Sequence, residues 1–425
     1  MENLIRKIKL IVGDPSLRNR VLFVLGALMV FRLFANIPIP AAAGHNLSTL
    51  LAQDQTLGFL NLLTGGGLSA VSLVLLGVGT YITSSIIFQL LTMMSPRIKE
   101  MYHEEGEMGR RKITQYSRIL AVPIGLVQGY GLIFYLIKQG LIPGLTPFEM
   151  ITNTIMVTAG SIFLMWIGEL ISEFGIGNGV SLIIFAGIVS RLPTTLAQIA
   201  FTFDVSQITL YAGALVAILL VILAVVYMTE AERPVPVTYA KQARGGGRMV
   251  GGSKTYLPLR VNQAGVIPII FALSILVFPR VIANALVGIT NHNTIQAIAL
   301  FVQRSLANVW INGILYFGLV FIFTYFYTAI TFDPHEIATN LQKNGAFIPG
   351  IRPGQQTSQY LGKILTRITF VGAVFLGLIA VLPLVMQSLT NLSSLAIGGT
   401  AILIVVSVVL EVIKKVDSQV SMREY

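Results

Sequence analysis

Few residues in this chain have the type and spacing that chemistry needs. His335-Glu336 begins like the zinc-binding helix motif, in which two His side chains four residues apart hold the metal and the Glu acts as a base. Thr339 occupies the place of the second His, so this position cannot hold zinc in that way. The chain also has no Cys, which excludes thiolate metal sites, a Cys nucleophile and disulfides.

A second pattern, Gly175-Ile-Gly-Asn-Gly179, has a glycine spacing similar to that of a dinucleotide-binding loop. Such a loop follows a β-strand, and no strand is expected before Gly175. We interpret the pattern as a tight turn between two helices. Because no nucleophile–base pair is evident elsewhere, the sequence predicts neither an enzyme nor a bound cofactor or metal.

The composition is that of a membrane protein. The chain is 54% hydrophobic and 11% charged, with a mean hydropathy of +0.78, whereas a soluble domain has roughly 25% charged residues. The net charge of +11 raises the possibility of nucleic-acid binding. The basic residues lie beside long apolar stretches, however, so membrane topology and anionic lipid headgroups explain most of this charge.

The basic residues are distributed unevenly along the chain. Most of the 29 Lys and Arg residues fall in every second linker between long uncharged stretches. Positive charge in short loops stays in the cytoplasm, so we predict that both ends of the chain are cytoplasmic. The basic linkers are the N-terminus to Arg20, Arg97–Arg118, Arg233–Arg260, Lys343–Arg367 and the tail from Lys414.

Ten apolar stretches are predicted to span the membrane, each of which needs about 20 residues. Two spans fit into Ile368–Leu410, with the polar run Gln387–Ser394 as the turn between them, and one lies within Gln55–Pro96. The other seven are Val21–Ala35, Ile119–Ile137, Met150–Gly168, Phe174–Ser190, Val205–Thr229, Val261–Pro279 and Ser305–Thr331.

The stretch Gln55–Pro96 is too long for one span, yet the charge pattern requires a single net crossing. Thr64-Gly-Gly-Gly67 divides it, because glycine triplets break helices. We expect Leu57–Leu63 to form a short piece and Leu68–Met94 a full span. The short piece either folds back into a cavity from the outside, where protein surrounds its backbone, or lies on the outer surface as an amphipathic helix.

Ten spans divide into two sets of five, and an odd number per set gives the halves opposite orientation, as in inverted repeats. The predicted fold is therefore an all-α polytopic membrane protein. Its parts are a cytoplasmic amphipathic segment (1–20), two halves (21–200 and 201–418) and a short cytoplasmic tail (419–425). The long basic loops at about 230–260 and 332–367 are the natural docking surfaces.

A secondary transporter with inverted repeats is the alternative at this point. Transporters carry ionisable residues at membrane depth. Here only Arg32 lies well within a span, near its outer end, while Glu169 and Glu173 lie at the cytoplasmic end of the fourth span. The sequence therefore offers no residue that would couple transport to an ion.

Four longer segments carry specific motifs: Gly106–Tyr116, Gly175–Gly187, Leu257–Pro268 and Gly345–Gly354. Together they resemble those of one known family, SecY, the pore subunit of the general protein-translocation channel of the bacterial plasma membrane. The resemblance extends from about Val21 to Leu410. It implies two five-helix halves around a central pore that passes unfolded secretory proteins and releases membrane segments sideways.

The resemblance also implies an apolar ring at the narrowest part of the pore. Val78 and Ile82 are four residues apart and so share one helix face, as do Ile184 and Ile188. Apolar side chains meeting at a narrow waist exclude water and ions by dewetting, yet they can part around an extended polypeptide because apolar contacts are not directional. The matching positions are Val78, Ile82, Ile184, Ile188, Ile270 and Ile404.

Three further sites are implied by the same resemblance. A plug of about residues 57–69 closes the pore from outside, and a lateral gate between the second and seventh spans, flanked by the third and eighth, opens toward lipid. Two Arg residues in the cytoplasmic loops match regions that engage a motor or the ribosome. The plug residues are Leu57, Phe59, Leu60, Leu63, Gly65, Gly66, Gly67, Leu68 and Ser69; the gate residues are Gln89, Asn262 and Ser274; the docking residues are Arg248 and Arg352.

The partners implied by the resemblance are the small membrane subunits SecE and SecG, the motor ATPase SecA, the ribosome, signal peptides and nascent chains. Anionic lipids follow from the charge pattern. Ribosomal RNA is the only nucleic acid that we expect the chain to contact.

Overall fold

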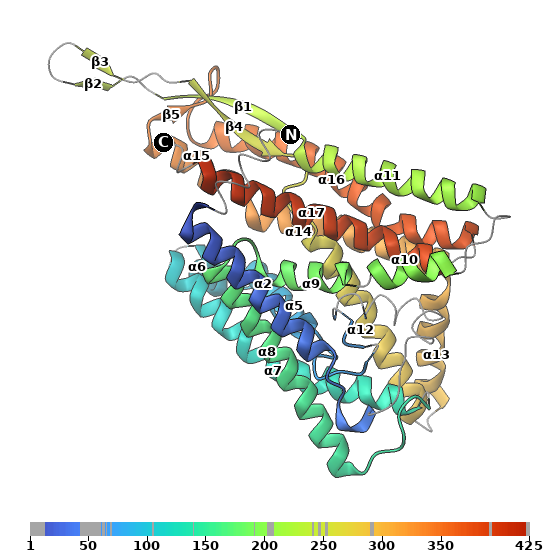
Figure 1. Ribbon diagram of the computed structural model, residues 1–425. Coiled ribbons are helices and arrows are strands. Elements are labelled where there is room, and N and C mark those ends of the chain that lie inside the picture. Colours follow the sequence, from blue (N-terminus) through green and yellow to red (C-terminus); the bar gives the residue numbers. More distant parts are fainter. Residues whose placement is uncertain are drawn as a thin grey trace.

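The computed structural model describes residues 13–42, 61, 64, 66–68, 70–103, 106–138, 140–190, 192–201, 208–239, 242–244, 248–250, 254–289, 293–390 and 393–421. Over this part the chain is mostly helical, and long helices lie side by side in a bundle (Figure 1). A strand pair projects from one end of that bundle. An amphipathic segment was expected at the N-terminus, and its residues 1–12 lie outside the described residues.

Some helices in the first half of the chain begin at polar caps. The Asp14 carboxylate accepts a hydrogen bond from the Ser16 amide at the start of the first long helix. Thr146 and Glu149 form a reciprocal capping box at the start of α8. These helices are α2 (Pro15–Ala35), α5 (Gly79–Met94), α6 (Pro96–His103), α7 (Gly106–Lys138), α8 (Pro147–Phe174), α9 (Gly179–Val189) and α10 (Leu192–Phe201), with a short 3-10 turn, η1 (Pro40–Ala42).

The second half adds seven helices over the described residues. Asn308 and Asp333 cap two of them by accepting hydrogen bonds from backbone amides. The helices are α11 (Ile208–Glu230), α12 (Ile267–Ile289), α13 (Asn293–Ala307), α14 (Val309–Thr331), α15 (Pro334–Lys343), α16 (Gln355–Thr390) and the last, α17 (Ser393–Ser421). The predicted turn between the last two spans is confirmed, since α16 ends and α17 begins within Gln387–Ser394.

Five short strands occupy the basic linkers, which the sequence argument treated as loops. In β1 (Glu232–Tyr239), Val235 and Val237 alternate with exposed residues and are buried. This alternation is the period of a half-buried strand. Strand β1 pairs antiparallel with β4 (Lys254–Arg260) and with β5 (Ala346–Phe347), and β2 (Gln242–Arg244) pairs with β3 (Arg248–Val250).

The predicted full span Leu68–Met94 is wrong over its first third. Helix α5 begins only at Gly79, and the described residues from Gly66 to Val78 form turns. Gly66 and Gly77 have positive φ angles of 95° and 57°, a backbone conformation that a right-handed helix does not allow. The helix thus begins further along the chain than the glycine triplet alone indicated.

Four other elements differ from the sequence argument. Helix α12 continues through Pro279 to Ile289, although the span was expected to end at that proline. Helices α10 and α13 lie in linkers where no helix was predicted. Helix α9 has 11 residues, which is too short to cross a hydrocarbon core of about 30 Å alone.

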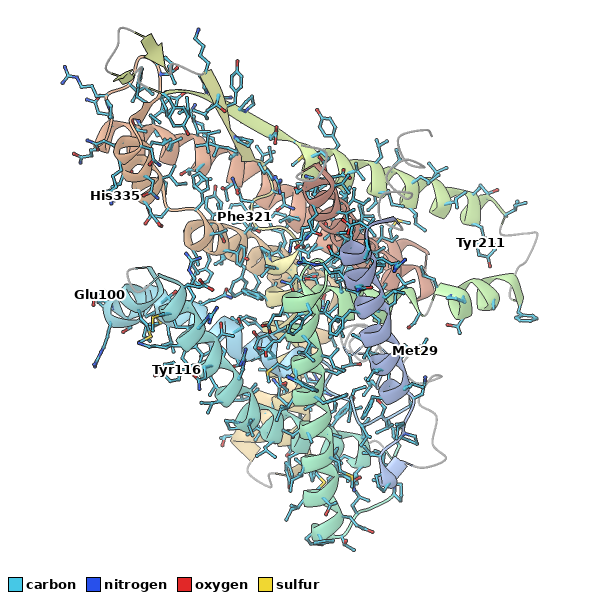
Figure 2. All side chains as sticks on the ribbon, turned by 60° about the vertical axis from the view of Figure 1, so that its left-hand side comes forward. Met29, Glu100, Tyr116, Tyr211, Phe321 and His335 are labelled. Atoms are coloured by element: carbon cyan, nitrogen blue, oxygen red, sulfur yellow. The ribbon has the colours of Figure 1, made fainter. Side chains whose placement is uncertain are left out.

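Five helices are long and apolar enough to cross a membrane, judged by length and composition over the described residues. Apolar side chains point away from the bundle on its outer helices, as Figure 2 shows for Met29 on α2. On α11, Leu223 is 70% exposed. Such a surface suits lipid contact. The five are Gly106–Lys138, Pro147–Phe174, Tyr211–Glu230, Val309–Lys343 and Gln355–Met386.

The start of α2 and the end of α17 pack together. Leu17, Ile176 and Val420 form a small buried cluster with Val21 and Val416 beside them. The beginning of the first described helix therefore lies next to the end of the last one.

Candidate functional site

The structure brings the six predicted ring residues together. Val78, the residue before α5, is 1% exposed, and Ile82 within α5 is 8% exposed. Ile184 and Ile188 come from α9. All six belong to one hydrophobic cluster, to which Ile270 of α12 and Ile404 of α17 also contribute. The helices α5, α9, α12 and α17 thus contribute to one large buried cluster, which also contains many other apolar residues.

Helix α9 lies in the middle of the bundle (Figure 1), where it packs against α8, α17 and α2. Its position is set by the glycine-rich turn that precedes it. Asn178 caps the helix by accepting hydrogen bonds from the Val180 and Ser181 amides. A Cβ atom added at Gly179 would lie 1.9 Å from the Gly168 carbonyl oxygen of α8. The prediction of a tight inter-helix turn is confirmed, and Val180 and Ile183 of α9 lie close against Gly168 of α8.

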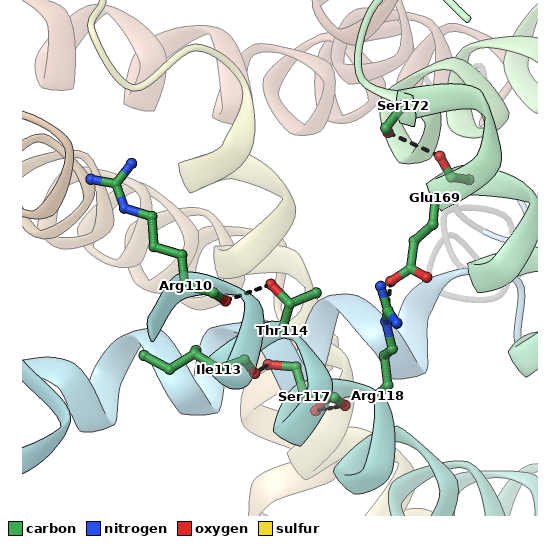
Figure 3. A network of polar contacts seen from close by, with 9 residues as sticks. Arg110, Ile113, Thr114, Ser117, Arg118, Glu169 and Ser172 are labelled. Atoms are coloured by element: carbon green, nitrogen blue, oxygen red, sulfur yellow. Dashed lines mark hydrogen bonds and ion pairs between the residues drawn. The ribbon is translucent and has the colours of Figure 1, made fainter. Parts of the chain in front are cut away.

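A polar network joins the ends of helices near this turn (Figure 3). Arg118 of α7 and Glu169 of α8 form an ion pair with an Nε–Oε1 distance of 2.7 Å. One turn along α8, the Ser172 hydroxyl accepts a hydrogen bond from the Gly179 amide at 2.8 Å. The sequence placed Glu169 at the cytoplasmic end of its span but gave no partner, because Arg118 is distant in the chain.

Only three of the nine predicted plug residues lie within the described residues. Leu68 is fully buried, in a cluster that also contains Ile39, Leu132 and Leu136 and is separate from the ring cluster. Gly66 and Gly67 lie in turns. Leu57, Phe59, Leu60, Leu63, Gly65 and Ser69 lie outside the described residues.

The three predicted gate residues do not form hydrogen bonds with one another in the described part of the chain. The Ser274 hydroxyl donates to the Ile270 carbonyl of its own helix at 2.9 Å. The Gln89 amide donates to Ser85 of its own helix at 3.2 Å. Gln89 Oε1 and Asn262 Oδ1 are buried acceptors that have no partner among the described residues. Helix α12 does pack against α5, α7 and α14, which is the seam that the resemblance implies.

The two docking residues lie in different parts of the loops. Arg352 is exposed within a shaped tip, where Gly350 and Gly354 have positive φ angles of 83° and 94°. The Thr357 hydroxyl donates to the Arg352 carbonyl at 2.9 Å and so fixes the backbone there. Arg248 lies in β3, paired with Arg244 of β2.

Over the described residues, no group of three or more His, Cys, Asp or Glu side chains is placed to hold a metal ion.

Comparison with known proteins identifies the family. A family profile described as SecY matches residues 72–413, which is most of the chain. The chain belongs to the SecY family. The protein translocase subunit SecY of Corynebacterium glutamicum is 39% identical, with 97% of each chain covered. That of Streptomyces coelicolor is 40% identical over 97% of this chain and 96% of the relative.

Solved structures share the SecY fold. A structure described as a protein conducting channel superposes with a TM-score of 0.66 at 18% identity, covering 95% of this chain and 93% of that one. A second, from work on the plug domain of the SecY protein and the closed state of its channel, superposes with a TM-score of 0.65 at 19% identity, with the same coverage. At these identities the likeness shows the fold.

Proposed function

We propose that this chain is the central subunit of a protein-conducting channel in the bacterial plasma membrane. It translocates unfolded secretory proteins and releases membrane-protein segments sideways into the bilayer. The observation that carries the proposal is the meeting of Val78, Ile184, Ile270 and Ile404, from the beginning of α5 and from α9, α12 and α17, in one buried apolar cluster. In the resting channel this cluster is the constriction, which excludes ions by dewetting.

The ring is the gate for threading chains, and the seam between α5 and α12 is the gate toward lipid. Gln89 and Asn262 each leave a buried acceptor without a partner in the described part of the chain, and a buried unpaired acceptor costs free energy. Since interhelical polar contacts in membranes average only about 0.6 kcal/mol, the seam is closed without being locked. An apolar signal segment then competes with these contacts for the surface between α5 and α12.

The plug of about residues 57–69 closes this constriction from outside. The described residues Gly66 to Leu68 are its C-terminal anchor. The chain divides into an N-terminal half, 21–200, and a C-terminal half, 201–418, which together supply ten membrane-spanning segments in inverted orientation. Both termini are cytoplasmic. Leu17 packing beside Val420 supports a common side for the two ends.

The cytoplasmic loops are the docking surface for the ribosome and for the motor ATPase SecA, and SecE and SecG are the small membrane partners. Arg352 at the exposed tip supplies a positive charge, and Arg248 lies on β3; an Arg side chain suits carboxylate and phosphate recognition. Strand β1 pairs with both β4 and β5 and so joins the two loops.

The proposal is tested by reconstitution. The full chain is placed with the small subunits in vesicles that contain anionic lipid, and the motor, ATP and an unfolded secretory precursor are added. We expect ATP-dependent protection of the precursor from external protease. Vesicles that lack the chain and reactions without ATP are the controls. Precursor that binds the vesicles but remains digestible in every condition would contradict the proposed function.

A further inference from the structure

The backbone that leads from the plug into α5 is irregular and deeply buried. Ser72, Val74 and Leu75 are fully buried, yet the described residues there form turns. Val71 has a positive φ angle of 43°, which a β-branched residue rarely adopts. Irregular backbone is stable at membrane depth only where protein surrounds it and satisfies its polar groups.

One side of this segment is held by the chain that follows α2. The Leu73 amide donates to the Ile37 carbonyl at 3.0 Å, and the Ile39 amide donates to the Val71 carbonyl at 3.0 Å. Pro38 and Ser72 form an isolated antiparallel bridge. These bonds hold the plug end of the segment but do not extend to Val78.

The other side of the segment is held by two small residues of α8. A Cβ atom added at Gly160 would lie 2.0 Å from the Leu73 carbonyl oxygen, so only glycine allows this approach. The Ser161 hydroxyl donates to the Gly77 carbonyl at 2.7 Å. The hydroxyls of Ser161 and Thr80 are 2.5 Å apart. Because Ser161 has one proton and gives it to Gly77, Thr80 is the donor in that second bond.

Ser161 thus holds the residues on both sides of Val78, since Gly77 precedes it and Thr80 follows it by two positions. Gly77 has the positive φ angle at which the irregular segment turns into α5. Val78 is itself the first residue of the proposed ring. The hydroxyl of one α8 side chain therefore fixes the backbone at the point where the plug segment, the ring and α5 join.

We propose that Gly160 and Ser161 are positioning residues that keep Val78 in the closed ring. This inference rests on the proposed channel function and extends it to α8, a helix that supplies none of the predicted ring or gate residues. Gly160 lets the Leu73 backbone lie directly against α8, and Ser161 holds Gly77 and Thr80. When these contacts are lost, the closed constriction is less stable relative to the open one.

The test is Ser161→Ala in the full chain, reconstituted in vesicles and measured for resting ion leak and for passage of precursors with weakened signals. We expect the leak to rise about threefold, the size that corresponds to one average interhelical hydrogen bond in a membrane. Thr158→Val is the matched control. The Thr158 hydroxyl donates to Thr154 of its own helix, so the leak should stay at the wild-type level.

The Thr80→Val variant separates positioning from general stability. Thr80 acts through Ser161, so its effect should vanish in the Ser161→Ala background, and the double variant should leak no more than Ser161→Ala alone. The positioning role would be overturned if the leaks caused by Thr80→Val and Ser161→Ala simply added in the double variant. It would also be overturned if the leak of each variant rose only as far as its unfolding temperature fell.

Gly160→Ala is the steric test, with Gly129→Ala as its control because the added methyl there meets Thr154 at an ordinary 3.6 Å. If the Gly160→Ala variant does not fold, the Ser161→Ala variant still tests whether α8 positions Val78. Wild-type vesicles that do not translocate would remove the proposed function itself. Wild-type vesicles that translocate, together with Ser161→Ala vesicles as tight and as selective as wild type, would overturn this inference alone.

Discussion

Thr238 of β1 pairs with Phe347 of β5 in an antiparallel register. The pair joins the loop that follows α11 to the loop that follows α14, which are far apart in the sequence. Beneath them Val235, Val237 and Leu259 pack against Leu361 of α16 in a separate hydrophobic cluster. The two proposed docking loops are therefore one folded unit with its own core.

Leu259→Ala should loosen both loops together. Leu259 is fully buried, and truncation of a buried Leu typically costs about 2–5 kcal/mol. We expect faster amide hydrogen exchange in β1, β4 and β5 alike. Tyr256→Ala is the control, because Tyr256 on the same strand is 66% exposed. Unchanged protection of β5 in Leu259→Ala would show that the loops fold independently.

Arg352→Glu should weaken motor-dependent export. The exposed guanidinium is held at a rigid tip, so reversing its charge repels an acidic partner. We expect roughly a tenfold loss of motor affinity, which corresponds to about 1.4 kcal/mol. Lys363→Glu makes the same charge change at an exposed position on α16. Equal losses from the two variants would point to general electrostatics in place of a docking role.

Ile184→Asn should let ions leak through the resting channel. An amide in the apolar waist gives water a hydrogen-bond partner and opposes dewetting. Ile183→Asn is the matched control, because Ile183 is also buried in the same cluster but lies about 100° further round α9. Both variants should be destabilised, and only Ile184→Asn should raise conductance. Equal conductance in both would remove Ile184 from the ring.

The sequence predicted the features that depend on composition and on local pattern. Charge alternation gave the helical membrane protein, and Asn178 with its neighbouring glycines gave the turn before α9. Strand β1 was missed although Val235 and Val237 alternate correctly, because Pro234 and Pro236 argue against a strand. The alternation of Val235 and Val237 with exposed residues is the sequence signal that could have identified β1.

The contacts between distant segments could not be predicted. The turn at Gly77 depends on Ser161 of another helix, and no local pattern reports such a partner. The same is true of Arg118 and Glu169, whose types were visible but whose pairing was not. The Ser274 hydroxyl donates to the Ile270 carbonyl of its own helix, and its role at the lateral gate stays a prediction.

The most direct test of the conducting pore is crosslinking to a secretory polypeptide halted during translocation. The chain has no Cys, so single Cys residues can be placed at Ile188 and Ile404 in the proposed ring and at Leu223 on the outer face of α11. We predict adducts with the halted polypeptide at both ring positions and none at Leu223. Adducts at Leu223 as strong as those at Ile404, or no adducts at either ring position, would contradict passage through this waist.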